Sequence, residues 1–115
     1  KYIYNADEKL LNIAQSAIGK CVGGTAVCGD RFICNASDRD FLRDTFSATT
    51  CDMETAAIAS VCDMAKIPYL SLRRVSDDAG DDAYANYNEM NTLEGQTLSE
   101  VFIKVLNTLC NEVDL

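Results

Sequence analysis

Residues 51–59 read CDMETAAIA, and a short distance later residues 76–79 read SDDA. In the first stretch a β-prone segment gives way to an Ala-rich run of high helix propensity, which predicts a strand followed by a helix. The second stretch follows another β-prone segment. Ligands of open α/β sheets bind beyond the carboxyl ends of the strands. We therefore expect Glu54 and Asp77 to face one crevice, in which their carboxylates would act on a polyol or a nitrogen base.

Helices and strands alternate along the rest of the chain. Helical spacing of apolar residues, with Asn5 or Asp7 as a cap, predicts helices over residues 7–18, 38–46, 54–66 and 98–110. We expect the helix over 54–66 to be buried on more than one side, because it has few polar residues. Strands are expected over residues 20–28, 48–53 and 69–76, and 80–97 is read as a lid-like segment or the start of a helix. The alternation favours an α/β fold with parallel pairing.

The composition excludes several classes of function. The chain has 115 residues, 48% of them hydrophobic, which suffices for one core. Its formal net charge is −8, from 18 acidic and 10 basic residues, so its field repels phosphate backbones and nucleic-acid binding is not expected. No apolar run approaches the length of a membrane span, and the first residues lack the apolar core of a signal peptide. We expect a soluble, cytoplasmic protein without a membrane partner.

The six cysteines do not suggest a disulfide framework or a metal site. They lie in largely apolar segments, no C-x-x-C spacing occurs, and the chain contains no His. Buried, reduced thiols are therefore expected, and a nucleophilic Cys would lack an imidazole partner. A cation-binding loop around Asp77 and Asp81 is disfavoured because the spacing of an EF-hand is not met. No metal or other cofactor is expected.

Three motifs carry a resemblance to a known family: VCGDRFI at residues 27–33, CDMETAAIA at 51–59 and LRRVSD at 72–77. In order and spacing they resemble the C-terminal half of the nucleoside phosphorylase and nucleosidase superfamily, and most of all the bacterial 5'-methylthioadenosine/S-adenosylhomocysteine nucleosidases. The resemblance implies a three-layer α/β phosphorylase/hydrolase-like fold. Residues 1–115 would supply the C-terminal part of one domain, without an internal boundary: part of its mixed sheet, with the flanking helices. The N-terminal half of the domain would then lie outside this chain.

Enzymes of this family break the N-glycosidic bond of a purine nucleoside through an oxocarbenium-like transition state. The resemblance implies that Asp77 is the general acid, which protonates N7 of the leaving adenine, and that Glu54 accepts hydrogen bonds from the ribose hydroxyls. Met53 would contact the sugar from below. Asp52 would lie beside the ribose, at a position where nucleosidases commonly carry Glu. Arg31 stands where a small residue is common.

The remaining substrate contacts are implied in the same way. Phe32 would stack on the adenine, and the backbone of Ile33 would read the edge of the base. Arg73 would lie near the catalytic water or an anion, and Ser76 belongs to the acid-bearing motif. Tyr87 would close the pocket over the substrate tail.

The residues alone leave simpler interpretations open. Without the resemblance, Asp77 could be a solvated loop acid, Glu54 an acid that the helix dipole favours, and Phe32 a core residue. The family's water-activating Glu would lie in the other half of the domain, so we expect the isolated chain to be incomplete for catalysis.

Two alternative functions remain. A purine nucleoside phosphorylase would need Arg to bind phosphate; Arg73 and Arg74 could contribute, but residues 88–92, where such enzymes tend to place an Arg, read NEMNT, so hydrolysis is favoured. The chain could instead be a non-catalytic fragment or interaction module. The resemblance also implies a homodimer or larger homo-oligomer, and the exposed edge of an incomplete sheet suggests pairing with the missing N-terminal segment.

Overall fold

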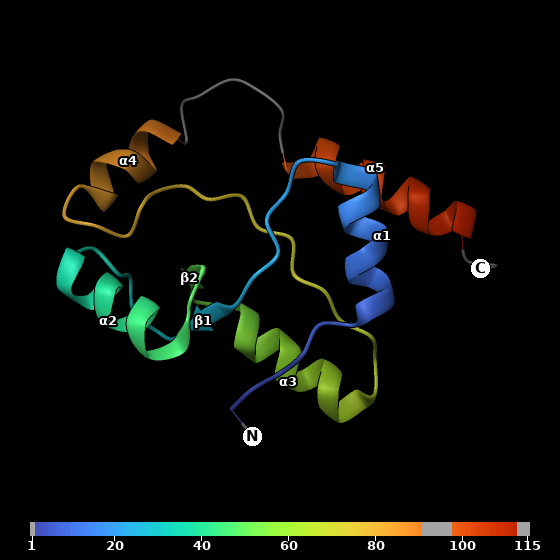
Figure 1. Cartoon of the computed structure of the whole chain (residues 1–115), viewed down its shortest axis with the longest axis horizontal. Helices are drawn as coiled ribbons and strands as arrows, with labels where there is room; N and C mark the ends of the chain where they lie inside the picture. Colours follow the sequence, from blue (N-terminus) through green and yellow to red (C-terminus); the bar gives the residue numbers. More distant parts are fainter. Residues whose placement is uncertain (1, 91–97, 113–115) are drawn as a thin grey trace. The chain divides into compact units, whose positions relative to one another are not determined.

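The structure, a computed structural model, describes residues 2–90 and 98–112 (Figure 1). Its helices are α1 (Glu8–Ile18), α2 (Ala36–Phe46), α3 (Thr55–Ala65), α4 (Ala83–Met90) and α5 (Leu98–Glu112), and its strands are β1 (Ala26–Cys28) and β2 (Thr50–Asp52). The chain forms two compact units. The helical unit contains the residues up to Gly23, Ala59–Arg73 and α5, and the sheet unit contains Gly24–Ile58 and the residues from Arg74 through α4.

Two amphipathic helices form the core of the helical unit. Helix α1 begins after Asp7, whose side chain accepts a hydrogen bond from the Leu10 N–H at 2.9 Å, and it ends at Gly19 with a φ of 78°. Its buried residues are Ile13 and Ala14, and it contacts α5, where Val105 is buried. The predicted helices over 7–18 and 98–110 are confirmed, with Asp7 rather than Asn5 as the cap.

The sheet unit is built on a parallel strand pair. Strand β1 pairs with β2 in the register Ala26↔Thr50, Val27↔Cys51 and Cys28↔Asp52, and α2 provides the crossover between them. The predicted parallel pairing is therefore confirmed. Since the N–H of Gly29 also donates to the Asp52 carbonyl at 3.2 Å, the loops after both strands leave the same edge of the sheet.

Both strands are shorter than predicted, and residues 69–76 do not form a strand. In the described part of the chain the sheet has two strands. Chain entry into β1 is tight, because a Cβ at Gly24 would lie 2.2 Å from Oγ1 of Thr49. β-prone residues become a strand only beside a partner strand, whereas the carbonyl of Tyr69 accepts the N–H of Asp7 at 2.7 Å. The segment also runs from the helical unit into the sheet unit.

Helix α3 differs from its prediction in burial. The helix forms as expected, but Ala59 is its one buried residue, while Ile58, Val61 and Met64 are 52%, 58% and 74% exposed. An apolar composition predicts that a helix is buried, but it does not predict which segments bury it.

Among the described residues, no helix is both long and apolar enough to span a membrane.

The segment after Gly80, read from the sequence as lid-like or as the start of a helix, forms a helix in part. Helix α4 occupies part of the expected lid-like region, and residues 91–97 lie outside the described part of the chain.

The cysteines form no disulfide: all six thiols are free. Cys21 and Cys110 are exposed, so the expectation that every thiol is buried was wrong. Apolar neighbours in the sequence do not by themselves place a thiol in the core.

Candidate functional site

The carboxylate of Asp52 caps helix α3 and shapes the turn that carries Glu54. Its Oδ1 accepts the N–H groups of Glu54 at 3.0 Å and Thr55 at 2.7 Å, and its Oδ2 accepts the Thr55 hydroxyl at 2.5 Å. Burial acts to raise the pKa of Asp52, but the hydrogen bonds from Thr55, Glu54 and Cys28 outweigh it, so the pKa is lower than the ordinary value. Asp52 therefore has a structural task in addition to the ribose contact that the sequence predicts.

Glu54 and Met53 lie between β2 and α3, and both are exposed. On the neighbouring strand, the pKa of the Cys28 thiol is raised by burial and by its hydrogen bond to Asp52, and to a lesser extent by the charges of Asp52 and Glu54. The end of β1 thus lies within the field of both carboxylates. As predicted from the sequence, the acids of the first motif are gathered at the carboxyl edge of the sheet.

Asp77 reaches this edge although its predicted strand is absent. Its Oδ2 accepts the Ser76 hydroxyl at 2.7 Å, and its Oδ1 accepts the N–H of Ala79 at 2.8 Å. The pKa of Cys51 in β2 is raised by burial first, and then by the charges of Asp77 and Asp52. The structure therefore brings Asp77 near the strand that precedes Glu54.

The GDRFI loop carries a half-buried Phe32 and a half-buried Ile33. The ring centroid of Phe32 lies 4.7 Å from that of Tyr84 in α4, with 40° between the ring planes. Tyr84 itself is 64% exposed. Phe32 and Tyr84 thus form a tilted aromatic pair at a distance typical of such contacts.

For Arg73 and Tyr87 the structure gives only the local setting. Arg73 is exposed, belongs to the helical unit, and donates from Nε to Oγ of Ser71 at 3.3 Å. Tyr87 belongs to α4, and its side chain lies outside the described atoms. The roles assigned to these two residues stay predictions.

The sequence motifs did not indicate Asn35 or Tyr84, which hold or contact the segment around Phe32. Asn35 caps α2: its Oδ1 accepts the Asp38 N–H and its Nδ2 donates to the Asp38 carboxylate, each at 2.8 Å. Arg31 also forms an ion pair with Asp38. The Asn35-x-x-Asp38 spacing is a capping signal that could have been read from the sequence. No comparable local signal marks Tyr84.

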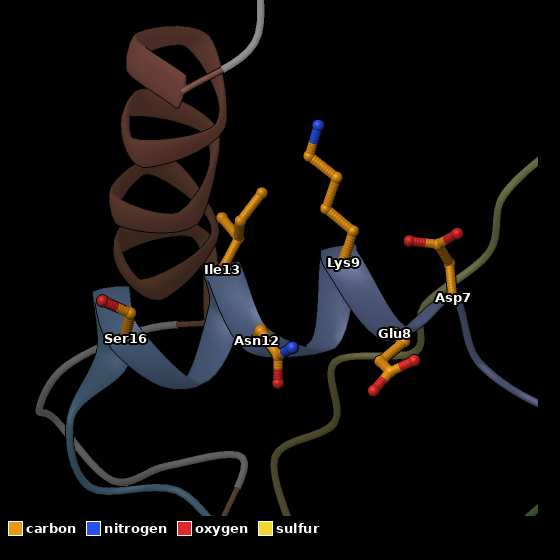
Figure 2. A pocket seen from close by; sticks show the side chains of 6 residues that line it. All are labelled: Asp7, Glu8, Lys9, Asn12, Ile13 and Ser16. Carbon is orange, nitrogen blue, oxygen red and sulfur yellow. The ribbon is translucent and has the colours of Figure 1, made fainter.

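Two hollows of the helical unit contain none of the predicted site residues. The larger, of about 650 Å³, is lined by Asp7, Glu8, Lys9, Asn12, Ile13 and Ser16 (Figure 2). The smaller, of about 160 Å³, is lined by Tyr4, Asn5, Asp7, Ala59, Asp63, Ile67, Pro68 and Tyr69. The larger hollow follows one helix and is lined mainly by exposed side chains, so its size is no indication of a built site. Within residues 2–90 and 98–112, no group of three or more Cys, Asp or Glu is arranged to hold a metal ion.

The chain is similar to known nucleosidases in sequence and in structure. The chain is 39% identical over 87 residues to the aminodeoxyfutalosine nucleosidase of Campylobacter jejuni, covering 72% of this chain and 38% of that protein. It is 34% identical over 113 residues to the 5'-methylthioadenosine/S-adenosylhomocysteine nucleosidase of Staphylococcus carnosus, covering 92% of this chain and 49% of that protein. The corresponding nucleosidase structure from Helicobacter pylori matches with a TM-score of 0.79 at 23% identity, covering 96% of this chain and 47% of that one.

These matches establish fold and family. The chain spans less than half the length of each of these three proteins. Its fold is the α/β nucleoside phosphorylase-like fold, of which it contains about half. Residues 1–111 match the family model of the phosphorylase superfamily, and the chain belongs to that family.

Proposed function

We propose that this chain supplies the adenine- and ribose-binding part of a nucleosidase that hydrolyses the N-glycosidic bond of a purine nucleoside of the 5'-methylthioadenosine or S-adenosylhomocysteine type. The similar proteins from C. jejuni and S. carnosus are nucleosidases, which supports hydrolysis of a nucleoside. The observation that most supports the proposal is that the charges of Asp77 and Asp52 both raise the pKa of Cys51 in β2, and that Asp52 holds the turn on which Glu54 lies.

In the proposed mechanism, Asp77 gives its proton to N7 of the purine while the bond between the anomeric carbon and N9 breaks. Neutral adenine leaves, and the ribosyl cation that remains is captured by water. The proton that the water loses passes to a base outside this chain. Ser76 and the Ala79 N–H orient the Asp77 carboxyl through their hydrogen bonds of 2.7 and 2.8 Å. General acid catalysis of this kind contributes about 10²–10⁴ in rate.

The other proposed contacts divide between sugar and base. Glu54 accepts hydrogen bonds from the ribose hydroxyls, a task suited to an ionised carboxylate, and Asp52 orients it by fixing the first turn of α3. Phe32 stacks on the adenine with Tyr84 behind it, and the Ile33 backbone reads the base edge. Met53, Arg73 and Tyr87 are proposed to contact the sugar, the water or anion, and the substrate tail.

The proposal extends to organisation. We propose that both compact units belong to one domain and that this domain forms a homodimer or larger homo-oligomer in the cytoplasm. Light scattering on the purified protein would report the mass of the particle. A monomer at micromolar concentration would remove the oligomer from the proposal.

The test of function is release of adenine from 5'-methylthioadenosine. A suitable protein is a chimera in which this chain follows the N-terminal half of the S. carnosus nucleosidase, since the two are 34% identical over 113 residues. We expect adenine release at the same rate with and without phosphate. An absolute requirement for phosphate would show a phosphorylase instead. A folded chimera without activity in either buffer would support a non-catalytic module.

A further inference from the structure

Three contacts join the segment that carries Phe32 to the segment that follows Asp77. The Ala36 N–H, in the first turn of α2, donates to Oδ1 of Asp81 at 3.1 Å. One turn further on, Nη1 of Arg39 lies 3.9 Å from Oδ2 of Asp78. The third contact is the pair of aromatic rings. In Figure 1 the loop that leads into α4 passes beside the start of α2.

In each segment the residue that makes the hydrogen bond lies a few positions after the residue that is proposed to meet the purine. Phe32 precedes Ala36 by four residues, and Asp77 precedes Asp81 by four. The N–H groups in the first turn of a helix have no partner within the helix, so a carboxylate from elsewhere satisfies one of them. The loop fits closely here, because a Cβ at buried Gly80 would lie 3.0 Å from Nη1 of Arg39.

From these contacts we infer that Asp81 is a positioning residue, which fastens the Asp77 loop to the first turn of α2 and so sets the distance between the acid and the Phe32 ring. The inference rests on the proposed function, in which Asp77 meets N7 and Phe32 meets the face of the same purine. A reacting group gains its rate advantage only when it is held in the productive geometry, and a displacement of about 1 Å can cost about 10²-fold. In this role the carboxylate of Asp81 acts through the two loops and not by contact with the purine or the acid.

The first test measures the contact itself in the full ¹⁵N-labelled chain. Asp81→Ala removes the acceptor, and the Ala36 amide should then exchange with solvent about tenfold faster, the size expected for loss of one hydrogen bond. Asp81→Asn keeps an oxygen at the same place and should restore slow exchange. Asp82→Ala, which removes the same charge one residue away, should leave the amide unchanged. Equal exchange in Asp81→Ala and the wild type would overturn the inference.

The second test measures adenine binding by titration calorimetry. Asp81→Ala should weaken adenine binding about tenfold, Asp81→Asn should bind nearly as the wild type, and Asp82→Ala should be unchanged. Undiminished binding in Asp81→Ala, or equal weakening in Asp81→Ala and Asp82→Ala, would refute the positioning role.

The two proposals can fail separately. If the wild-type chain binds no adenine, the proposed purine site is wrong. The positioning role is then decided by the ¹³C signals of the Phe32 ring and the Asp77 carboxyl. They should move in Asp81→Ala and stay in place in Asp82→Ala, and any other pattern overturns the inference.

Discussion

The two compact units are stabilised in different ways. The helical unit depends on apolar contacts, with Ile13 and Ala14 of α1 and Val105 of α5 buried. Among the described residues the sheet unit has one buried apolar residue, Ala83, and it depends more on side chains that cap its helices, as Asp52 does for α3 and Asn35 for α2, whereas α1 of the helical unit has one such cap, Asp7. The larger hollow lies on the helical unit, but the gathered carboxylates lie in the sheet unit. Charge and fixed geometry, rather than the size of a hollow, thus distinguish the proposed site from the rest of the molecule.

The largest effect is expected from removal of the proposed general acid, Asp77, in the sheet unit. In the chimera, Asp77→Asn should lower the rate of adenine release by about two orders of magnitude or more and leave the fold intact, because the amide cannot protonate N7. The rate is followed by adenine absorbance and the fold by circular dichroism. Asp82→Asn is the matched control and should retain activity. Near-wild-type turnover in Asp77→Asn would remove Asp77 from the acid role.

The next largest effect concerns the core of the helical unit. Ile13→Ala should lower the free energy of unfolding by about 3 kcal/mol, because Ile13 is 4% exposed and its truncation leaves a cavity. Ile58→Ala, at a site 52% exposed, should cost no more than about 0.5 kcal/mol. Urea unfolding measures both. Equal losses in the two variants would contradict the assignment of the core.

A smaller effect is expected from the cap in the sheet unit. Asp52→Ala should lower the free energy of unfolding by about 1 kcal/mol at pH 7, through loss of the helix cap. The folded-state pKa of Asp52 lies below the ordinary value of 3.8, so this stability is present above that value and is lost as the pH falls through the folded-state pKa. Urea unfolding near pH 7 and pH 3 should show the difference from wild type shrinking. A difference that grows toward low pH would show that the sign is wrong.

The smallest predicted effect reports the proximity of Asp77 to β2. Asp77→Asn removes a charge that raises the pKa of the Cys51 thiol, so more thiolate forms and alkylation of Cys51 accelerates by a small factor. Mass spectrometry of iodoacetamide-treated protein near pH 8 measures the rate at Cys51, with Asp78→Asn as control. An unchanged rate in Asp77→Asn would separate Asp77 from the sheet edge.

The predictions that succeeded depend on local signals. The helix that Asp7 caps and the parallel pairing of β1 and β2 follow from spacing and connection length. The strand expected over 69–76 and the burial of α3 were wrong, because both depend on which other segments lie alongside. The contact between Ala36 and Asp81 joins residues 45 apart, for which the sequence has no periodic signal.

The site residues follow the same division. The motifs identified Asp77 and Glu54 as candidates, and the structure places Asp77 and the turn that carries Glu54 near β2. The tasks of Asp52 and Asp81 became visible only from the distances of their carboxylate oxygens to particular N–H groups. Residue type thus indicates the chemistry, whereas the role of a positioning residue requires coordinates.

The most direct test of the account is an amide titration of the ¹⁵N-labelled chain with adenine. We predict that the signals that move belong to residues 29–36 and 76–84 of the sheet unit, around Phe32 and Asp77. The amides of α1 that line the larger hollow should stay in place. Shifts confined to α1, or no shift at millimolar adenine, would contradict the claim that these two segments form a purine site.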